Sequence, residues 1–226
     1  MKTMMDWRIS THRCHFLLAF FTCLCLSCET ESYETGDGKY SYLRADFVEA
    51  HTSIEKEVDY AVNDDGETLQ LTPHAQAKWA TVADSMYRAL LYYNKEKTAN
   101  VPISMMRVSV LKARENVPSD SIKTDPVTFE SSWMSANAKY LNLSFYVKTG
   151  KADDENAIQT IGLLCDSITP TSVNLRLYHD QSTIPEYYSA RVYASIPIME
   201  NYKGKELHLA LQTYQGEKNL SYAIPH

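Results

Sequence analysis

From about residue 40 onward, apolar and polar residues alternate along the chain, as they do in strands that cover a core with one face. The clearest case is "EVDYAVNDDGETLQLT" (57–72), in which alternation from Val58 to Val62 leads into Asp65-Gly66 and resumes at Leu69. An Asp-Gly pair between two alternating runs is typical of a β-hairpin. This segment is therefore predicted to form a hairpin with its turn at the Asp-Gly step.

Four further segments of the N-terminal half differ in how clearly their pattern identifies them. "YSYLRADFVEA" (40–50) and "VPISMMRVSVLKA" (101–113) alternate as strands do. "SMYRALLYYNK" (85–95) has the residue types of a strand, but Met86, Leu90 and Tyr93 are also spaced for one face of a helix, so both remain open. "HAQAKWATVAD" (74–84) predicts at most a turn or two of helix.

The C-terminal half contains short strand-like runs separated by polar turns. The polar segment "PSDSIKTDP" (118–126) lies between two prolines and lacks periodicity, so it indicates a domain boundary or a long loop within one domain. Beyond it, closely spaced runs without an intervening helical pattern favour an antiparallel β-sandwich. These runs are "KYLNLSFYVKTG", "AIQTIGLLC", "SVNLRLYHD", "YYSARVYASIPI", "KELHLALQTYQG" and "LSYAI". Scarce glycine, at 7 residues, and abundant tyrosine, at 16, also favour strands.

The first 27 residues form a separate segment with the features of a secretory signal. Lys2, Arg8 and Arg13 precede the uninterrupted apolar run "FLLAFFTCLCL", from Phe16 to Leu26. This run has the length of a signal-peptide core and is too short to cross a bilayer as a helix. A buried core helix is the alternative, but it would not normally lie at the extreme N-terminus behind a basic flank.

The cysteines point to a lipid anchor at the end of this leader. Cys14, Cys23, Cys25 and Cys28 all lie in the leader or at its end, and only Cys165 lies in the body, so no disulfide framework is expected. The leader cysteines also lack the paired second half and the histidines of a closed zinc site.

The remaining interpretation is a bacterial lipoprotein signal, cut just before a lipidated cysteine. Ser27 before Cys28 fits that signal, whereas Cys25 three positions before the acceptor departs from the usual aliphatic residue. We predict lipidation at Cys28, with ordinary cleavage and a soluble product as the alternative, and a polar tether over 28–39. The lipid is expected to bind the protein to the outer membrane of the cell envelope, on either its periplasmic or its surface face.

Removal of the leader makes the chain more acidic and argues against one class of partner. The full chain has 22 basic and 28 acidic residues, and the part after the leader has 19 and 27, a net charge of −8. Nucleic acids are bound through lysine and arginine. We therefore expect no nucleic-acid partner, and a membrane contact through the N-terminal lipid together with an envelope protein or a glycan.

Several segments together resemble the NigD-like lipoproteins of Bacteroides and related bacteria. They are the cysteine leader, "GDGKYSYLRADFVEA", "YRALLYYNK", "SVLKA", "WMSANAKYLNLSFYVKTG" and "LRLYHDQ". The resemblance implies a mostly β protein, with an N-terminal OB-like small barrel followed by a C-terminal immunoglobulin-like antiparallel β-sandwich. The expected domains are a signal peptide (1–27), the tether (28–39), the barrel (40–113), a linker (114–126) and the sandwich (127–226). The family carries no established activity, so it provides no site residues to transfer.

The chain contains none of the common catalytic signatures. HExxH, paired CxxC and GxSxG patterns are absent. His179 followed by Asp180 could orient an imidazole by a carboxylate, but a solvated strand end is the favoured interpretation. His208 is expected to point outward, and Cys165 to be a buried small hydrophobe. No catalytic, cofactor-binding or metal-binding residue is therefore assigned.

Three other features have both a functional and a plain interpretation. The acidic clusters "NDDGE" (63–67) and "ADDEN" (152–156) could bind calcium but lack a spaced calcium-loop pattern, so charged hairpin turns are favoured. Tyrosine pairs at 92–93 and 187–188, with Trp79 and Trp133, could form a surface for a sugar or a peptide, although strand tyrosines more often cover a core. Asp-Ser-aliphatic tripeptides mark possible O-glycosylation, with Ser121 in the expected linker as the most accessible candidate.

These observations favour a non-enzymatic, lipid-anchored envelope protein that binds a protein partner or an extracellular polymer. Two alternatives of other classes remain. One is a hydrolase with a site assembled from sequence-distant residues such as His179, and the other is a bacteriocin-related immunity or protective protein, which rests on the family name alone.

Overall fold

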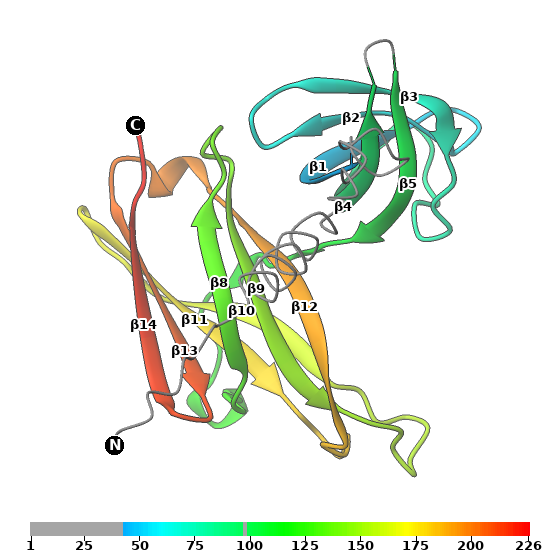
Figure 1. Ribbon diagram of the computed structural model, residues 1–226. Helices are drawn as coiled ribbons and strands as arrows, with labels where there is room; N and C mark the ends of the chain where they lie inside the picture. Colours follow the sequence, from blue (N-terminus) through cyan, green and yellow to red (C-terminus); the bar gives the residue numbers. More distant parts are fainter. Residues whose placement is uncertain (1–42, 97–98) are drawn as a thin grey trace, which may run out of the picture. The chain divides into compact units, whose positions relative to one another are not determined.

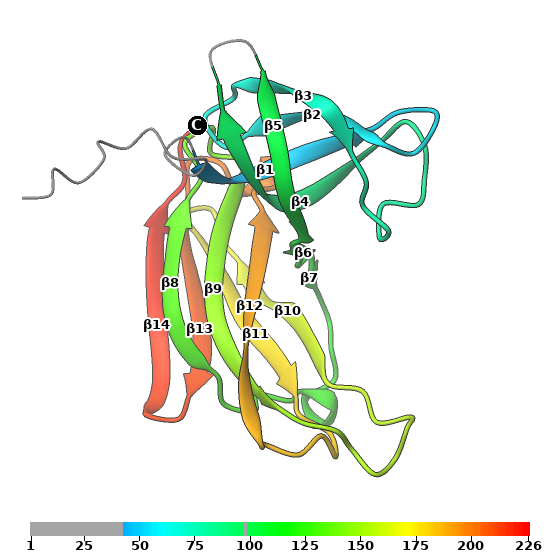
Figure 2. The same cartoon turned by 45° about the vertical axis from the view of Figure 1, so that its right-hand side comes forward.

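The computed structural model describes residues 43–96 and 99–226, and the expected signal peptide, Cys28 and the tether lie outside them. These described residues belong to one compact unit. Its described residues form strands and two short 3₁₀ helices, without an α-helix. Figure 1 shows the strands in a barrel, β1–β5, and in a sandwich, β8–β14, and Figure 2 also labels the short strands β6 and β7 of the sandwich. The mostly β prediction is confirmed.

The N-terminal strands close into a five-stranded barrel with the order β1-β2-β3-β5-β4. This number and order of strands match a small OB-like barrel. Its interior is filled mainly by alternating residues of β1, β2 and β4, among them Val48, Ala61 and Leu91. The strands are β1 (Leu43–Thr52), β2 (Val58–Asn63), β3 (Thr68–Ala75), β4 (Ser85–Lys95) and β5 (Asn100–Arg107).

The predicted hairpin is present as β2 and β3, which pair antiparallel with Ala61 opposite Leu69. Gly66 in its turn has φ of +85°, a left-handed conformation that glycine adopts without a steric penalty. Asn63 completes the turn, because its side-chain oxygen accepts the backbone N–H of Asp65 at 3.1 Å and that of Glu67 at 2.8 Å. The Asp-Gly signal was therefore sufficient to locate this hairpin.

The segment that the sequence left open between strand and helix is strand β4. Ala89, Leu91 and Tyr93 face the barrel core, while Arg88 and Leu90 on the other parity are also buried. A strand buried on both faces loses the alternation of apolar and polar residues. This double burial explains why its pattern was also compatible with a helix. The 74–84 segment forms no helix, because it runs from the end of β3 into the connection to β4.

The C-terminal strands form two sheets, with the orders β14-β13-β11-β10-β7 and β6-β12-β9-β8. Most pairs are antiparallel, but β7, β6 and β13 each pair in parallel with a neighbour, so the sandwich is not purely antiparallel. Figure 2 shows β9 between β8 and β12 in the four-stranded sheet. The strands are β6 (Ser109–Val110), β7 (Ala113–Arg114), β8 (Thr128–Met134), β9 (Tyr140–Thr149), β10 (Thr160–Ile168), β11 (Ser172–Asp180), β12 (Tyr188–Pro197), β13 (Glu206–Thr213) and β14 (Gly216–Ala223).

Strand pairing places residues 109–114 in the sandwich, whereas the sequence analysis extended the barrel to residue 113. β6 pairs with β12 and β7 pairs with β10, each over only two residues. The sequence "MMRVSVLKA" continues the apolar pattern of β5 without a break, so the pattern could not show that the chain leaves one sheet for another. The expected linker contains the 3₁₀ helix η2 (Ser119–Ser121).

The sandwich core lies between the two sheets and is built from the inward parity of each strand. Leu143 and Phe145 of β9 meet Leu175 of β11 and Leu209 of β13 in one apolar cluster. These positions alternate with Asn142, Ser144 and Tyr146 on the opposite face of β9, as the pleat of a strand requires. The outward face of β9 is therefore polar, and it carries the residues described next.

Candidate functional site

The outward face of the sheet formed by β8, β9 and β12 carries buried polar and aromatic side chains. Asn142 and Ser195 are fully buried there, although they point away from the sandwich core. The barrel covers them, and Arg88 of barrel strand β4 donates hydrogen bonds to both side chains. Buried polar groups are stable only when they are hydrogen-bonded, and Asn142 and Ser195 are bonded to each other and to Arg88.

Arg88 is the centre of this polar contact. Its Nη1 lies 2.7 Å from Oδ1 of Asp64, and its Nη2 donates to Oδ2 of the same carboxylate at 2.8 Å. Nε donates to the Ser195 hydroxyl at 3.1 Å, and Nη2 also donates to the Asn142 side-chain oxygen at 3.0 Å. The guanidinium lies 4.1 Å from the ring centroid of Tyr140. A paired, stacked and hydrogen-bonded arginine of this kind fixes the barrel residues against the sandwich sheet.

Aromatic rings continue the same contact beyond Arg88. Phe47 of β1 points out of the barrel and meets Trp133 of β8 edge-on, with ring centroids 5.1 Å apart. It meets Tyr193 of β12 in the same geometry at 5.7 Å. Tyr92 and Leu90 of β4 pack against this group. Edge-to-face aromatic pairs contribute about 0.5–1.5 kcal/mol beyond the area that they bury.

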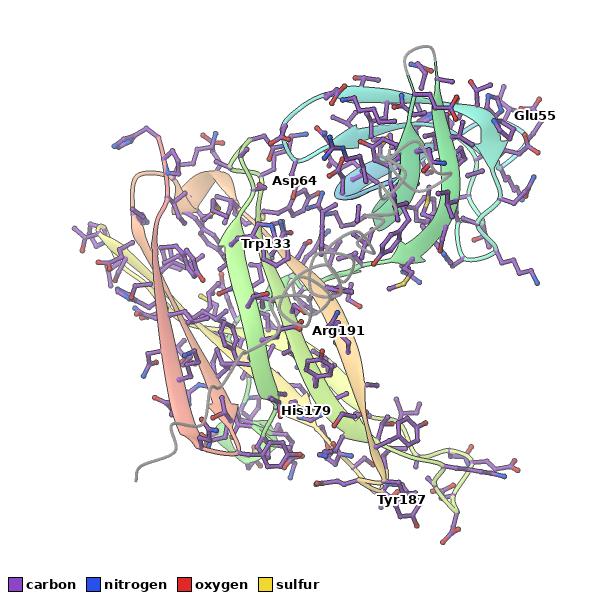
Figure 3. The ribbon with its side chains drawn as sticks, in the orientation of Figure 1. Glu55, Asp64, Trp133, His179, Tyr187 and Arg191 are labelled. Carbon is purple, nitrogen blue, oxygen red and sulfur yellow. The ribbon has the colours of Figure 1, made fainter. Side chains whose placement is uncertain are left out.

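A second polar network lies farther along the same sheet face, around Glu130 and Arg191. Nη2 of Arg191 donates to Glu130 at 2.6 Å, and Nη1 donates to the Tyr193 hydroxyl at 3.0 Å. Ser144 donates to the other oxygen of Glu130, and this hydrogen bond, with Arg191, lowers the pKa of the Glu130 carboxyl. The network therefore holds an ionised carboxylate and a guanidinium in fixed positions. Figure 3 shows Trp133 and Arg191 on this sheet.

These two networks border a cleft with a volume of about 730 Å³, within the range of sites that bind small molecules or side chains. Strands β1, β4, β8, β9 and β12 and the β2–β3 turn contribute its walls. Its aromatic lining residues are Phe47, Tyr92, Trp133 and Tyr193. The cleft is therefore a concave surface that combines four aromatic rings with polar and acidic residues, and hydrogen-bonded polar side chains hold it in shape.

Sequence reasoning identified part of this site. Trp133 and Tyr92 were named as members of an aromatic surface, and both line the cleft, whereas Tyr187 and Tyr188 are exposed in the β11–β12 region. The contributions of Phe47, Arg88 and Arg191 were missed. Each lies in a strand whose local pattern is ordinary, and only the pairing of strands distant in sequence brings them together.

His179 is not a solvated strand end, as the sequence favoured, because its side chain is only 1% exposed. Nδ1 lies 2.9 Å from the Asp125 carbonyl oxygen, and Nε2 lies 2.9 Å from the Gln159 amide nitrogen. The Asp180 carboxylate instead accepts the backbone N–H of Ser182. The prediction of a solvent-exposed His179 was wrong because residues 123–125 run beside the end of β11 and cover this histidine. The hypothetical imidazole–carboxylate pair is therefore not formed.

The remaining predicted residues lie apart from the cleft. Cys165 is half-buried against the sandwich core, and burial raises the pKa of its thiol. His208 is half-buried, with Nδ1 2.9 Å from the Ser221 hydroxyl. In the "ADDEN" cluster, Asp154 accepts the backbone N–H of Asn156, as a turn residue does. Ser121 is exposed in η2, so its O-glycosylation stays a prediction.

The described part of the chain lacks both a cluster of metal-binding side chains and a membrane-spanning helix. In residues 43–96 and 99–226, no group of three or more His, Cys, Asp or Glu side chains could hold a metal ion. Within those same residues, no helix is long and apolar enough to cross a membrane.

A histidine on the barrel, which the sequence analysis did not single out, joins two segments. Nδ1 of His51 lies 2.7 Å from the Asp59 carboxylate, and Nε2 lies 3.2 Å from that of Asp84. Its ring stacks on Tyr60, with centroids 4.5 Å apart. The hydrogen bond to Asp59 raises the pKa of His51, against the opposing effect of burial, and Asp84 adds to the increase. The imidazole therefore connects β1 to β2 and to the residue before β4.

This contact predicts a pH-dependent stability. Because the folded pKa is raised above the ordinary value of 6.5, the contribution of His51 is fully present below that pH and is lost as pH rises through the raised pKa. We expect His51→Phe, which keeps a ring on Tyr60, to remove a stabilisation of about 1 kcal/mol or less at acidic pH and to have a smaller effect at alkaline pH. Urea unfolding at pH values of about 5.5 and about 8.5 checks this. An identical difference between variant and parent at both pH values would contradict it.

The C-terminal domain matches a known family. The profile described as "NigD-like C-terminal beta sandwich domain" matches residues 109–224, more than half of the chain. That range begins at β6, in agreement with the strand pairing above. Among curated proteins, none matches this chain.

Several solved structures share the fold over both domains. A NigD-like immunity protein from Bacteroides caccae is 21% identical, with a TM-score of 0.62, over 80% of this chain and 96% of that chain. A proposed toxin-related protein from Parabacteroides distasonis is 17% identical, with a TM-score of 0.60, over 80% and 93% of the two chains. A proposed lipoprotein from Bacteroides fragilis is 13% identical, with a TM-score of 0.54, over 80% and 97%. Identities at this level show a shared fold.

Proposed function

The chain belongs to the NigD-like family, and from that premise we propose that it is a lipid-anchored binding protein of the cell envelope, without catalytic activity of its own. The observation that carries this proposal is the aromatic cleft beside Trp133. A concave surface of this size with fixed polar groups is the ordinary form of a binding site. The role is that of an accessory module that holds a protein partner or an extracellular polymer.

The non-enzymatic part of the proposal is supported by the chemistry of the described residues. His179, the base of the alternative hydrolase hypothesis, is buried, and its two ring nitrogens lie beside a carbonyl and an amide. A general base must reach the proton that it removes, and both ring nitrogens of this buried side chain already lie at hydrogen-bond distance from protein groups. The similar structures are described as an immunity protein, a toxin-related protein and a lipoprotein, and none of those descriptions is that of an enzyme.

The anchor predicts a simple fractionation result. Cys28→Ala should move the protein from the membrane fraction to the soluble periplasmic fraction or the medium, because the acyl chains contribute about 0.8 kcal/mol for each buried CH₂. Cys23→Ala is the matched control, since that cysteine lies in the same leader but outside the three positions before the proposed acceptor. Immunoblots of separated fractions measure both. A soluble Cys23→Ala protein, or a Cys28→Ala protein still in the membrane after cleavage, would contradict lipidation at Cys28.

The binding role is tested by mild cross-linking of intact cells that express the tagged full-length protein, followed by detergent extraction, capture and mass spectrometry. Asp65 is exposed in the β2–β3 turn at the cleft, so Asp65→Arg places an opposite charge there with little cost to the fold. Asp153→Arg makes the same change in the exposed β9–β10 loop, away from the cleft. A partner that is lost with Asp65→Arg and kept with Asp153→Arg supports the proposal. Two results count against the proposal. One is that both variants capture the partner equally well, and the other is that neither the parent nor either variant captures a partner.

A further inference from the structure

The cleft beside Trp133 carries charged side chains of one sign. No lysine or arginine is among its lining residues, all of which belong to the described part of the chain. The charged lining residues are Asp46, Asp64, Asp65 and Glu130. A surface of this kind repels phosphate and other anions, and it attracts a positive charge.

Two of these four carboxylates are paired, a third faces the barrel, and one is free to meet a ligand. Arg88 pairs with Asp64, and Arg191 pairs with Glu130. Asp46 lies on the side of β1 that faces the barrel core, where its carboxylate accepts a hydrogen bond from the Tyr93 hydroxyl. Within the described residues, Asp65 forms no ion pair, and it is exposed in the β2–β3 turn. The cleft therefore has negative charge beyond what the chain's own arginines balance.

The aromatic residues around the cleft already bind guanidinium groups of this chain. Arg88 lies over the ring of Tyr140 at 4.1 Å from its centroid, and Arg191 lies over Tyr146 at 5.0 Å and Tyr193 at 5.8 Å. Each guanidinium is also held by a carboxylate. Aromatic rings combined with carboxylates form the usual environment for a cation in a protein site. The lining rings and the unpaired Asp65 carboxylate offer the same combination to a ligand.

We infer that the cleft binds a basic side chain, an arginine or a lysine, presented by a protein partner. This inference rests on the binding function proposed above and names the chemistry of its ligand. A neutral glycan would use the rings but would gain little from the unpaired Asp65 carboxylate, and an anionic polymer would be repelled by it. The charge of the lining residues therefore favours a basic segment of a protein over either polymer.

Trp133 provides a direct reporter for the test. Trp7 lies in the leader, so the exported chain has only Trp79 and Trp133, and Trp79 packs on Tyr87 in the barrel cluster, away from the cleft. In the exported chain with Cys28→Ala and Trp79→Phe, tryptophan fluorescence reports the cleft alone. This protein is titrated with an oligoarginine peptide, an oligoglutamate peptide and a neutral maltooligosaccharide. We expect a saturable change with oligoarginine and none with the other two.

A matched pair of variants separates cleft binding from general attraction to an acidic protein. Asp65→Asn should weaken oligoarginine binding about two- to fivefold, as expected for loss of one exposed charge partner. Asp153→Asn removes the same charge from a distant exposed loop and should leave the affinity unchanged. Added salt should weaken the binding in the parent, because the attraction is between charges near the surface.

The inference is overturned by a response to the maltooligosaccharide in place of oligoarginine, by no response to any probe, or by equal weakening in the two variants. Equal weakening would show that the peptide follows net charge and not the cleft. If such a result accompanies cross-linking that depends on Asp65, the binding function stands and only the basic character of its ligand is wrong. If the cross-linking also fails, both proposals are wrong.

Discussion

Replacing Arg88 by alanine is expected to destabilise the protein by about 3–5 kcal/mol, the largest effect of any single polar substitution that we propose. The substitution removes the guanidinium that pairs with Asp64 and donates to Asn142 and Ser195. The Asp64 carboxylate then stays largely buried without its opposite charge, and Asn142 and Ser195 each lose a partner. A buried charge or polar group left without its partner costs far more than the intact pair contributes.

Urea unfolding of the parent and of Arg88→Ala measures this effect. The informative control is the double variant Arg88→Leu with Asp64→Leu, which removes both charges. Because no unpaired carboxylate remains, the double variant should lose less stability than Arg88→Ala. A loss below about 1 kcal/mol for Arg88→Ala would show that water replaces the missing partner and that the contact is not a stable junction.

Phe145→Ala is expected to cost about 3–5 kcal/mol through the cavity that it leaves in the sandwich core. Phe145 is 1% exposed and packs among leucines of both sheets. The packed sheets on either side of it restrict the collapse that would fill the space. Thermal or urea unfolding measures the loss.

Tyr146→Ala is the matched control for this substitution, since Tyr146 is the next residue of β9 and points to the opposite face. There it contacts the Glu130–Arg191 network, which is partly exposed. We expect a loss of about 1 kcal/mol or less for Tyr146→Ala. Comparable losses for both variants would mean that the core is not where the strand parity places it.

The site itself was only partly predictable, because the sequence of a strand does not show which of its two faces another strand or domain will cover. Trp133 and Tyr92 could be named from the sequence because aromatic residues in strands are candidates for a binding surface. Phe47 could not, because its parity in β1 is resolved only when Val48 and Ala50 are seen to face the barrel core. Arg88 was hidden for the same reason, since an arginine in an apolar strand resembles any solvent-facing residue until a second domain covers it.

His179 illustrates the opposite error. Strand parity and the following polar residues indicated a solvated end of β11, but the chain from Lys123 to Asp125 runs alongside and covers the imidazole. That segment is more than fifty residues away in the sequence and has no periodicity, so no local pattern could predict where it would lie. An irregular segment that packs on the end of a strand buries residues there, and neither the sequence of the segment nor that of the strand shows it.

The sequence by itself determined the strand-rich class, the hairpin at Asp65-Gly66, and, by resemblance, the barrel and sandwich in that order. These follow from local alternation and turn chemistry, which act between neighbouring residues. The tertiary structure alone decided that β4 is a strand buried on both faces, that residues 109–114 join the sandwich, and that Arg88, Phe47 and Trp133 meet around one cleft. These features depend on contacts between residues far apart in the chain, and burial there follows from strand pairing and domain contact, which the local pattern of apolar residues does not encode.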